Sequence, residues 1–338
     1  MEDGPDCGEH LPVGLSGCLS SCLGSGLDEE RLFLIDTDTA ADDAVAIMMA
    51  LAYPGVRVLA LTTVAGNVCV DQATRNALKT LDVCGRLDVP VFVGASSPLV
   101  REITYATDVH GADGLGDNWF EEVGEPATGG AVEAALDLIG RHGPKLTWIA
   151  LGPLTNVALA LRADQETCLR AGRVLVMGGA GDGVGNITPA GEFNMYVDPE
   201  AAREVVGSGL PIRVVGWDIA RRDALVDREF RERLRASGNP KAEFAYDVTR
   251  RLWAFASAKH HAGYMDLADP SAMAAALEPD LAEWEPRYVD VECAGELTRG
   301  ALVVDHLGVT GNPPNVELCR RLDAEGFKRL LFDLLTSR

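Results

Sequence analysis

Short runs of β-branched residues alternate with longer stretches of helical apolar spacing from residue 31 onward, and this alternation limits the possible folds more than any other feature. Such runs form parallel strands, because the helix between two strands returns the chain to the same end of the sheet. The sequence therefore predicts an α/β fold, with an open, doubly wound, mainly parallel sheet flanked by helices on both faces.

The strands are predicted at residues 32–36, 56–63, 91–93, 146–150, 174–177 and 212–215. Helices are predicted at residues 42–52, 72–84, 131–141, 156–162 and 199–206. A mostly helical stretch at 227–277, short strands near 288–293 and 302–305, and a closing helix at 324–335 complete the prediction. Because no change in composition marks a linker after residue 31, we expect one domain over residues 31–338, preceded by a flexible tail over residues 1–30.

The chain carries 51 acidic and 30 basic residues, which gives a formal net charge of −21. A surface this negative repels nucleic-acid backbones and anionic lipid headgroups. No apolar run reaches the roughly 18 residues that a membrane-spanning helix needs. We therefore expect a small neutral substrate or a hard cation as partner, and neither nucleic acid nor a membrane. The eight cysteines form no CxxC pair, so we expect reduced thiols in the cytoplasm.

Four aspartates lie within eight residues at the end of the first predicted strand, namely Asp36, Asp38, Asp42 and Asp43. Open α/β sheets bind ligands at the carboxyl ends of their strands. Carboxylates this close repel one another, and a bound divalent cation removes that repulsion. Because no His or Cys stands nearby in the sequence, the all-oxygen ligands favour calcium or magnesium over zinc.

Two other interpretations of this segment stay open. Asp42 and Asp43 could cap a helix and complement its dipole, although that role leaves the two earlier aspartates without a function. The stretch from Asp36 to Thr39 also resembles the DxDxT pattern of haloacid-dehalogenase-like phosphohydrolases, in which the first Asp would be the nucleophile, although Ala40 stands where that pattern has Thr. That pattern is normally followed by a turn and a cap, whereas here a second acidic pair leads directly into a helix.

Further short motifs follow the acidic segment DTDTAADDA in order. They are TTVAGN ending at Asn67, VHG at His110, LGPLTN from Leu151, VMGGA from Val176, GNITPAGEFN from Gly185, VDPEAA from Val197 and ADP from Ala268. In this order and at these separations they resemble the nucleoside hydrolase family, from about residue 31 to the C-terminus. The family usually opens with DxDPGxDDA. Here Thr39 and Ala40 replace Pro and Gly, while every acid is kept.

The resemblance implies a calcium-dependent N-ribohydrolase of purine or pyrimidine salvage, which cleaves the bond between base and ribose. It implies that Ca²⁺ is bound by Asp38, Asp43, the main-chain carbonyl of Leu151 and Asp269. Asp38 would also accept a proton from the attacking water. Negative charge beside the ribose suits this reaction, because the transition state resembles an oxocarbenium ion. The residues that would hold the ribose hydroxyls are Asp42, Asn67, Asn186, Glu192, Asn194 and Asp269.

Several of these residues also have ordinary structural interpretations. Asn67 could shape a loop, and His110 could be a surface residue. Glu192 and Asn194 have the spacing of a polar strand face. Asp269 could cap a helix that has Pro270 at its first position.

The resemblance is weakest at the leaving base. Many family members carry His immediately before the last Asp, where it is thought to protonate the base, and this chain has Ala268. His260 and His261 lie a few residues upstream and could replace it. Together with His110, the candidates to line the base pocket are the aromatic residues Trp119, Trp253, Phe255 and Tyr264. Stacking aromatics are typical of purine-specific relatives, which leaves a purine preference open.

Two alternatives to a nucleoside hydrolase remain at this point. One is a phosphohydrolase with Asp36 as nucleophile, and the other is a non-catalytic protein that binds nucleoside or ribose. For the hydrolase, the resemblance implies a homodimer or homotetramer.

Overall fold

The computed structural model describes residues 30–259 and 263–337. His260, His261 and all of the predicted tail except Glu30 lie outside the described residues. An eight-stranded sheet in the order β3-β2-β1-β4-β5-β6-β12-β9 forms the centre of the fold. Its neighbours pair in parallel except β9, which is antiparallel to β12. The predicted fold class is confirmed.

The strands of this sheet are β1 (Arg31–Thr37), β2 (Val56–Thr63), β3 (Val91–Val93), β4 (Leu146–Ala150), β5 (Arg173–Met177), β6 (Ile212–Val215), β9 (Ala282–Arg287) and β12 (Val316–Leu322). Two antiparallel pairs lie outside it: β7 (Leu225–Asp227) with β8 (Tyr264–Asp266), and β10 (Val289–Val291) with β11 (Leu302–Val304).

The helices up to the end of β5 are α1 (Ala41–Ala52), α2 (Val70–Val83), α3 (Thr107–His110), α4 (Ala131–His142), η1 (Gly143–Lys145), α5 (Thr155–Ala163) and α6 (Gln165–Cys168). Those that follow are α7 (Phe193–Val197), α8 (Pro199–Val206), α9 (Trp217–Asp223), α10 (Arg228–Ala236), α11 (Pro240–Val248), α12 (Arg250–Lys259), α13 (Ala268–Leu277), η2 (Pro279–Leu281) and α14 (Ala324–Thr336). Among the described helices, none combines the length and the apolar character needed to cross a lipid bilayer.

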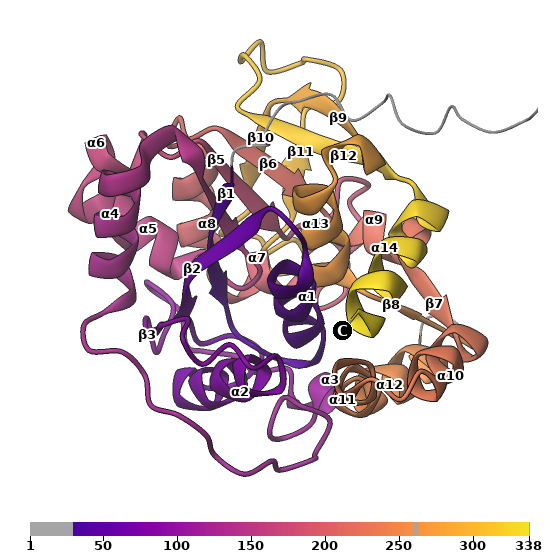
Figure 1. The fold of residues 1–338 in the computed structure, drawn as a ribbon. Helices are drawn as coiled ribbons and strands as arrows, with labels where there is room; N and C mark the ends of the chain where they lie inside the picture. The colour runs from indigo at the N-terminus through magenta and orange to yellow at the C-terminus, as the bar shows by residue number, and fades with distance from the viewer. Residues whose placement is uncertain (1–29, 260–262, 338) are drawn as a thin grey trace, which may run out of the picture.

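Side chains of each inner strand alternate between two hydrophobic clusters, one on each face of the sheet. On β1, Phe33 and Ile35 belong to the cluster under α1, α13 and α14, while Leu34 belongs to the cluster under α4, α5 and α8. Figure 1 shows these two groups of helices on opposite sides of the sheet. Burial on both faces explains why these strands appear in the sequence as continuous apolar runs.

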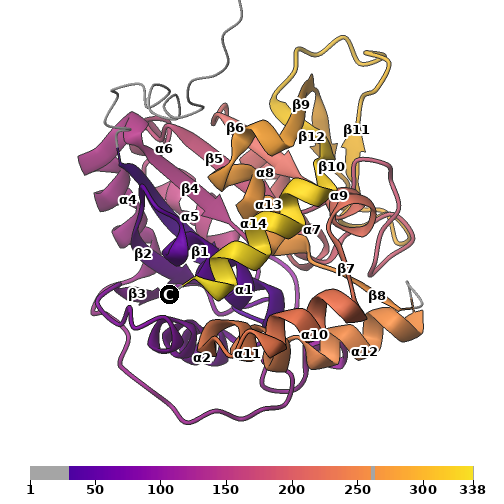
Figure 2. The ribbon, with the colours of Figure 1, turned by 45° about the vertical axis from the view of Figure 1, so that its right-hand side comes forward.

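The strand order reverses between β1 and β4, which are neighbours although two strands separate them in the chain. Such a reversal leaves a crevice at the carboxyl ends of the two strands, where ligands bind. The segment after β1 carries the four aspartates, and Leu151 follows β4 directly. Helices α10 to α12 lie together beside α1 and α2 (Figure 2), and α12 packs against α3.

The sequence prediction missed β7, β8, β9 and β12. β9 contains Pro286, and β12 ends with the exposed side chains of Arg320 and Arg321, so neither has the apolar pattern of an inner strand. The short strands expected near residues 288–293 and 302–305 exist as β10 and β11, but they pair with each other outside the main sheet.

Candidate active site

A tight turn joins β1 to α1 and fixes the acidic segment. Thr37 Oγ1 donates to Asp43 Oδ1 at 2.5 Å, and the Ala40 amide donates to Asp43 Oδ2 at 2.9 Å. The Thr39 amide donates to Thr37 Oγ1 at 3.1 Å. These bonds close the turn without the Pro and Gly usual in the family. Asp43 therefore helps to cap the start of α1, as the capping interpretation proposed. Its carboxylate still lies beside those of Asp42 and Asp269.

Asp38 lies completely buried between two glycine-bearing loops. Its Oδ2 accepts a 2.6 Å hydrogen bond from the Asn67 amide, whereas its Oδ1 has no hydrogen-bond partner. A Cβ atom on Gly66 would collide with Oδ2, and one on Gly152 would lie 2.9 Å from Oδ1. The glycines of the TTVAGN and LGPLTN motifs are therefore required by the close approach of both loops to this carboxylate.

Three buried carboxylates meet at the crevice. Asp42, Asp43 and Asp269 each offer an oxygen, and these atoms lie within 4.8 Å of one another, so the three could hold a metal ion. Asp38 is not a member of this group, although the charge of Asp43 acts on it. Burial raises the pKa of Asp38, Asp42 and Asp269, and the charge of Asp43 raises each of them further. The unpartnered Asp38 oxygen and this all-oxygen donor set fit a hard divalent cation.

Asp36 and Asn156 hold the ends of neighbouring strands together behind the carboxylates. Asn156 Nδ2 donates to both oxygens of Asp36, at 3.1 and 3.0 Å, and to the Thr63 carbonyl at 2.9 Å. Asn156 Oδ1 accepts from the Ala95 amide at 2.9 Å. Burial raises the pKa of Asp36 to about 7. Asp36 is only 2% exposed and does not line the pocket beside these carboxylates, which argues against its role as the nucleophile of a phosphohydrolase.

Glu192 and Asn194 lie on the other side of the crevice, at the start of α7. Glu192 is the N-cap of this helix and accepts from the amides of Asn194 and Gly179, at 3.0 and 2.8 Å. Burial raises the pKa of Glu192 to about 7. Asn194 Nδ2 donates to the Leu151 carbonyl at 2.7 Å. The alternative of a polar strand face is wrong, because a helix begins here.

The remaining predicted residues of the acidic and ribose groups also lie in or beside the crevice. Asn67 is buried, whereas Asn186 is exposed at the rim. Asp269 is in the first turn of α13 but is not its cap, since the N-cap position is Leu267. The capping interpretation of Asp269 is therefore wrong.

His110 ends α3 and is buried rather than a surface residue. Its Nδ1 lies 3.8 Å from Asp42 Oδ1 and has no hydrogen-bond partner. Burial lowers the pKa of His110 to about 4. The imidazole is therefore neutral near pH 7, with an unused polar atom beside the carboxylates.

The crevice widens into a pocket with about 940 Å³ of empty space, including solvent at its mouth. Of the residues described above, those that line it are Asp42, Asn67, His110, Leu151, Asn186, Glu192, Asn194 and Asp269, whereas Asp38 and Asp43 do not. The rest of the lining is largely aromatic and apolar, and we call it the base end. Trp217 Nε1 donates to Asp266 Oδ2 at 2.6 Å, and both side chains are buried. The residues of the base end are Tyr105, Ala106, Asp108, Val109, Met177, Ile187, Phe193, Trp217, Leu252, Phe255, Ala256, Asp266 and Ala268.

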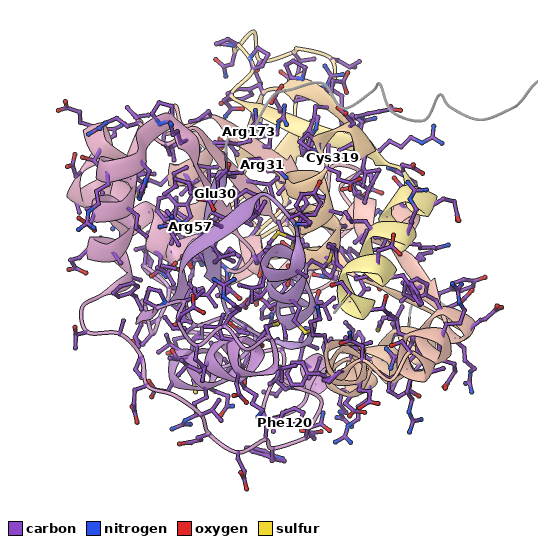
Figure 3. All side chains as sticks on the ribbon, in the orientation of Figure 1. Glu30, Arg31, Arg57, Phe120, Arg173 and Cys319 are labelled. Atoms are coloured by element: carbon purple, nitrogen blue, oxygen red, sulfur yellow. The ribbon has the colours of Figure 1, made fainter. Side chains whose placement is uncertain are left out.

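Of the four aromatic candidates for the base pocket, only Phe255 lines it. Trp119 is 65% exposed and borders a separate hollow with Phe120 and Arg75. Figure 3 labels Phe120, the residue after Trp119, on the segment between α3 and α4. The placement of Trp119 in the pocket was wrong because its amide bonds Asp113 Oδ2 at 2.7 Å, in a left-handed backbone conformation that directs the chain outward.

Tyr264 and Trp253 also lie elsewhere. Tyr264 is 45% exposed on β8 and is not among the lining residues. Trp253 packs against the core, with the Arg231 guanidinium 5.1 Å from its ring centroid. The structure therefore corrects both placements.

Sequence reasoning missed four residues of the base end, namely Tyr105, Phe193, Trp217 and Asp266. A signal existed for Trp217, because it begins the helix that follows β6 and so stands at the ligand-binding edge of the sheet. Tyr105 stands in a loop that no local pattern marked. Asp266 ends β8, a short strand inside the stretch predicted as mostly helical.

Comparison with known proteins gives a consistent result. The family model described as inosine-uridine preferring nucleoside hydrolase matches residues 33–329. The pyrimidine-specific ribonucleoside hydrolase RihA of Citrobacter koseri is 40% identical over 311 residues, which cover 89% of this chain and 97% of that protein. A solved plant nucleoside hydrolase, PpNRh1, matches with a TM-score of 0.86 and 33% identity, over 91% of this chain and 100% of that chain. A purine-preferring ribonucleoside hydrolase from Gardnerella vaginalis matches with a TM-score of 0.85 and 28% identity, over 90% and 98%.

Proposed function

The chain belongs to the inosine-uridine preferring nucleoside hydrolase family and is an N-ribosyl hydrolase, and on that premise we propose that it hydrolyses pyrimidine ribonucleosides with the aid of Ca²⁺. The observation that carries this proposal is the group of buried carboxylates formed by Asp42, Asp43 and Asp269, together with the unpartnered oxygen of the buried Asp38. Buried charges this close need a compensating cation, and oxygen ligands suit calcium.

Asp38, Asp43, Asp269 and the Leu151 carbonyl would hold the ion. The position of Asn194 supports the carbonyl ligand, because its 2.7 Å hydrogen bond fixes the direction of the Leu151 oxygen. Asp42 belongs to the same group of carboxylates and would bind ribose on the side of His110. When bound, calcium supplies positive charge that offsets the carboxylates and lowers the pKa of nearby water.

Asp38 would act as the general base. Its Oδ2 is held by the Asn67 amide, which leaves Oδ1 to accept the proton of the attacking water. Asn67, Asn186, Glu192 and Asn194 would position the ribose hydroxyls. As the bond to the base breaks, positive charge develops on the sugar, and the surrounding carboxylates stabilise it.

The pyrimidine preference replaces the purine preference left open by the sequence. It is supported by the RihA relatives, which are described as pyrimidine-specific. The five described cysteines form no disulfide, which supports the cytoplasm as the protein's compartment.

Release of free ribose from uridine, cytidine, inosine and adenosine tests this proposal, with and without a calcium chelator. We expect chelator-sensitive release that is fastest from uridine or cytidine. Faster release from inosine or adenosine would overturn the pyrimidine preference, and no release from any nucleoside by folded protein would leave only the binding-protein alternative.

A further inference from the structure

Helix α12 forms one wall of the base end, so its position decides how closely that wall approaches the base. Leu252, Phe255 and Ala256 of this helix line the pocket. Residues three and four positions apart lie on one side of a helix. Trp253 is on another side of α12 and packs against the core. A shift of α12 would therefore move three lining residues together.

The direction of α12 is set where it meets α11. Helix α11 ends at Val248, and Thr249 alone separates it from α12, which begins at Arg250. We call this point the α11–α12 junction. The last turn of a helix leaves carbonyl oxygens without backbone donors. The junction therefore contains acceptors that need donors from elsewhere in the fold.

Arg231 on α10 supplies two of these donors. Its Nη1 donates to Thr249 Oγ1 at 2.5 Å, and its Nη2 donates to the Tyr246 carbonyl at 3.1 Å. Its guanidinium carbon lies 4.6 Å from the ring centroid of Tyr246 and 5.1 Å from that of Trp253. Because Tyr246 belongs to α11 and Trp253 to α12, one side chain contacts both helices across the junction.

Arg231 is a buried cation without an acidic partner. The residue is 6% exposed, and among the described residues its guanidinium forms no ion pair with a carboxylate. Burial lowers the pKa of Arg231 to about 10, so the group still carries its charge at neutral pH. The carboxyl end of α11 and the two aromatic faces offset part of the cost of this burial. An apolar side chain would avoid that cost, but it could not make directed hydrogen bonds to the junction.

The segment after α3 holds the same junction by other bonds. Arg250 donates to the carbonyls of Gly116 and Asp117, the second at 2.6 Å. Asn118 Nδ2 donates to the Asp247 carbonyl at 3.1 Å. The junction is therefore bonded to two elements, and Arg231 is the contribution of α10.

We infer that Arg231 is a positioning residue for the base, because it fixes the α11–α12 junction and so holds the lining residues of α12 against the base. The inference deepens the proposed function and rests on it. Without the guanidinium, α12 should move about Thr249 and its contact with the base should weaken. The carboxylates and the ribose-binding groups lie on other elements and should keep their places.

The test compares the KM for uridine with the inhibition constant of free ribose, on protein that circular dichroism shows to be folded. Ribose lacks a base, so its binding reports only the part of the site that α12 does not line. Arg231→Met keeps an unbranched apolar stem and removes the guanidinium. It should raise the KM for uridine about fivefold to tenfold and change the inhibition constant of ribose by less than about twofold.

The matched control is Arg235→Met, one helical turn further along α10. The Arg235 guanidinium carbon lies 5.1 Å from the same Tyr246 ring, but Arg235 is exposed and makes no hydrogen bond to the described residues of the junction. Its replacement should change the KM for uridine by less than about twofold.

Thr249→Val provides a second variant, because it removes the hydroxyl that accepts from Arg231 and keeps the size of the side chain. It should raise the KM for uridine in the same way. Combining it with Arg231→Met should add little, since both changes break the same contact.

Three results would overturn the inference alone. One is an unchanged KM for uridine in Arg231→Met, and another is an equal rise in Arg235→Met. The third is an equal loss of uridine and ribose binding, which would show that Arg231 supports the whole site rather than the base end. If the wild type releases no ribose from uridine, the proposed function fails and the inference fails with it.

Discussion

Replacing Asn156 by alanine should destabilise the fold more than the removal of any contact at the surface. The Asn156 side chain bonds Asp36, the Thr63 carbonyl and the Ala95 amide, and so connects the ends of β1 and β2 and the chain after β3 to α5. Alanine leaves these three groups without that partner in a site from which water is excluded. Asn156 itself is 2% exposed.

The expected loss follows from those three groups. A buried polar group left without a partner costs about 1–3 kcal/mol. Three such groups would cost about 3–9 kcal/mol, and we expect a loss in the lower half of that range because Thr62 also bonds Asp36. Since a domain is stable by only about 5–15 kcal/mol, the variant should retain roughly half of the wild-type free energy of unfolding.

Urea unfolding followed by tryptophan fluorescence measures this loss, at a fixed calcium concentration. The control is Asn312→Ala, which removes an exposed amide and should change the free energy of unfolding by less than about 0.5 kcal/mol. A loss below about 1 kcal/mol for Asn156→Ala would show that the strand ends do not depend on this side chain, and would refute the reasoning.

Three further variants test other parts of the site. Burial raises the pKa of Glu192 from 4.5 to about 7, so the folded state binds its proton more tightly than the unfolded state, and this residue should cost the wild type about 3 kcal/mol of stability as pH rises from 4.5 to 7. In Glu192→Gln, the free energy of unfolding in urea should lack that part of the change between pH 5 and pH 8. The same change in both proteins would contradict the raised pKa of Glu192. Asn194→Ala should weaken calcium binding, measured by calorimetry, about tenfold or more because the Leu151 carbonyl loses its 2.7 Å donor; unchanged affinity would speak against that carbonyl as a ligand. Ala268→His should raise kcat for uridine about tenfold at pH 6, with a decline above the pKa of the new imidazole; a gain that does not decline as the imidazole loses its proton would show that the new side chain does not act as an acid.

The inner sheet could be predicted because its strands are buried on both faces. The runs that became β3, β4 and β6 consist of apolar or β-branched residues between clear helices, and their bounds match the prediction. β9 is an edge strand that pairs with β12, β12 itself joins the sheet by pairing with β6, and β7 and β8 are three residues each. Local sequence carries little information about such elements, because tertiary pairing decides whether they form.

The same distinction between local sequence and tertiary packing applies to the site. The acidic segment could be placed from the sequence because its four aspartates follow one strand directly, at the edge where ligands bind. The base end brings together Tyr105, Phe193, Trp217 and Asp266, which are far apart in the chain. They become neighbours only because the loop before α3, the start of α7, α9 and β8 meet at the crevice. Trp119 was misplaced for the related reason that a hydrogen bond to Asp113 sets the direction of its loop.

The most direct test of the account is ribose release from uridine by the wild type and by Asp38→Asn, each measured with calcium, with a chelator and with calcium restored. The account predicts calcium-dependent hydrolysis by the wild type that the chelator abolishes and added calcium restores. It predicts a loss of at least about 10³-fold in Asp38→Asn, because that variant lacks the proton acceptor. Hydrolysis by Asp38→Asn near the wild-type rate, or wild-type hydrolysis that survives the chelator, would contradict the central role given to this carboxylate and its ion.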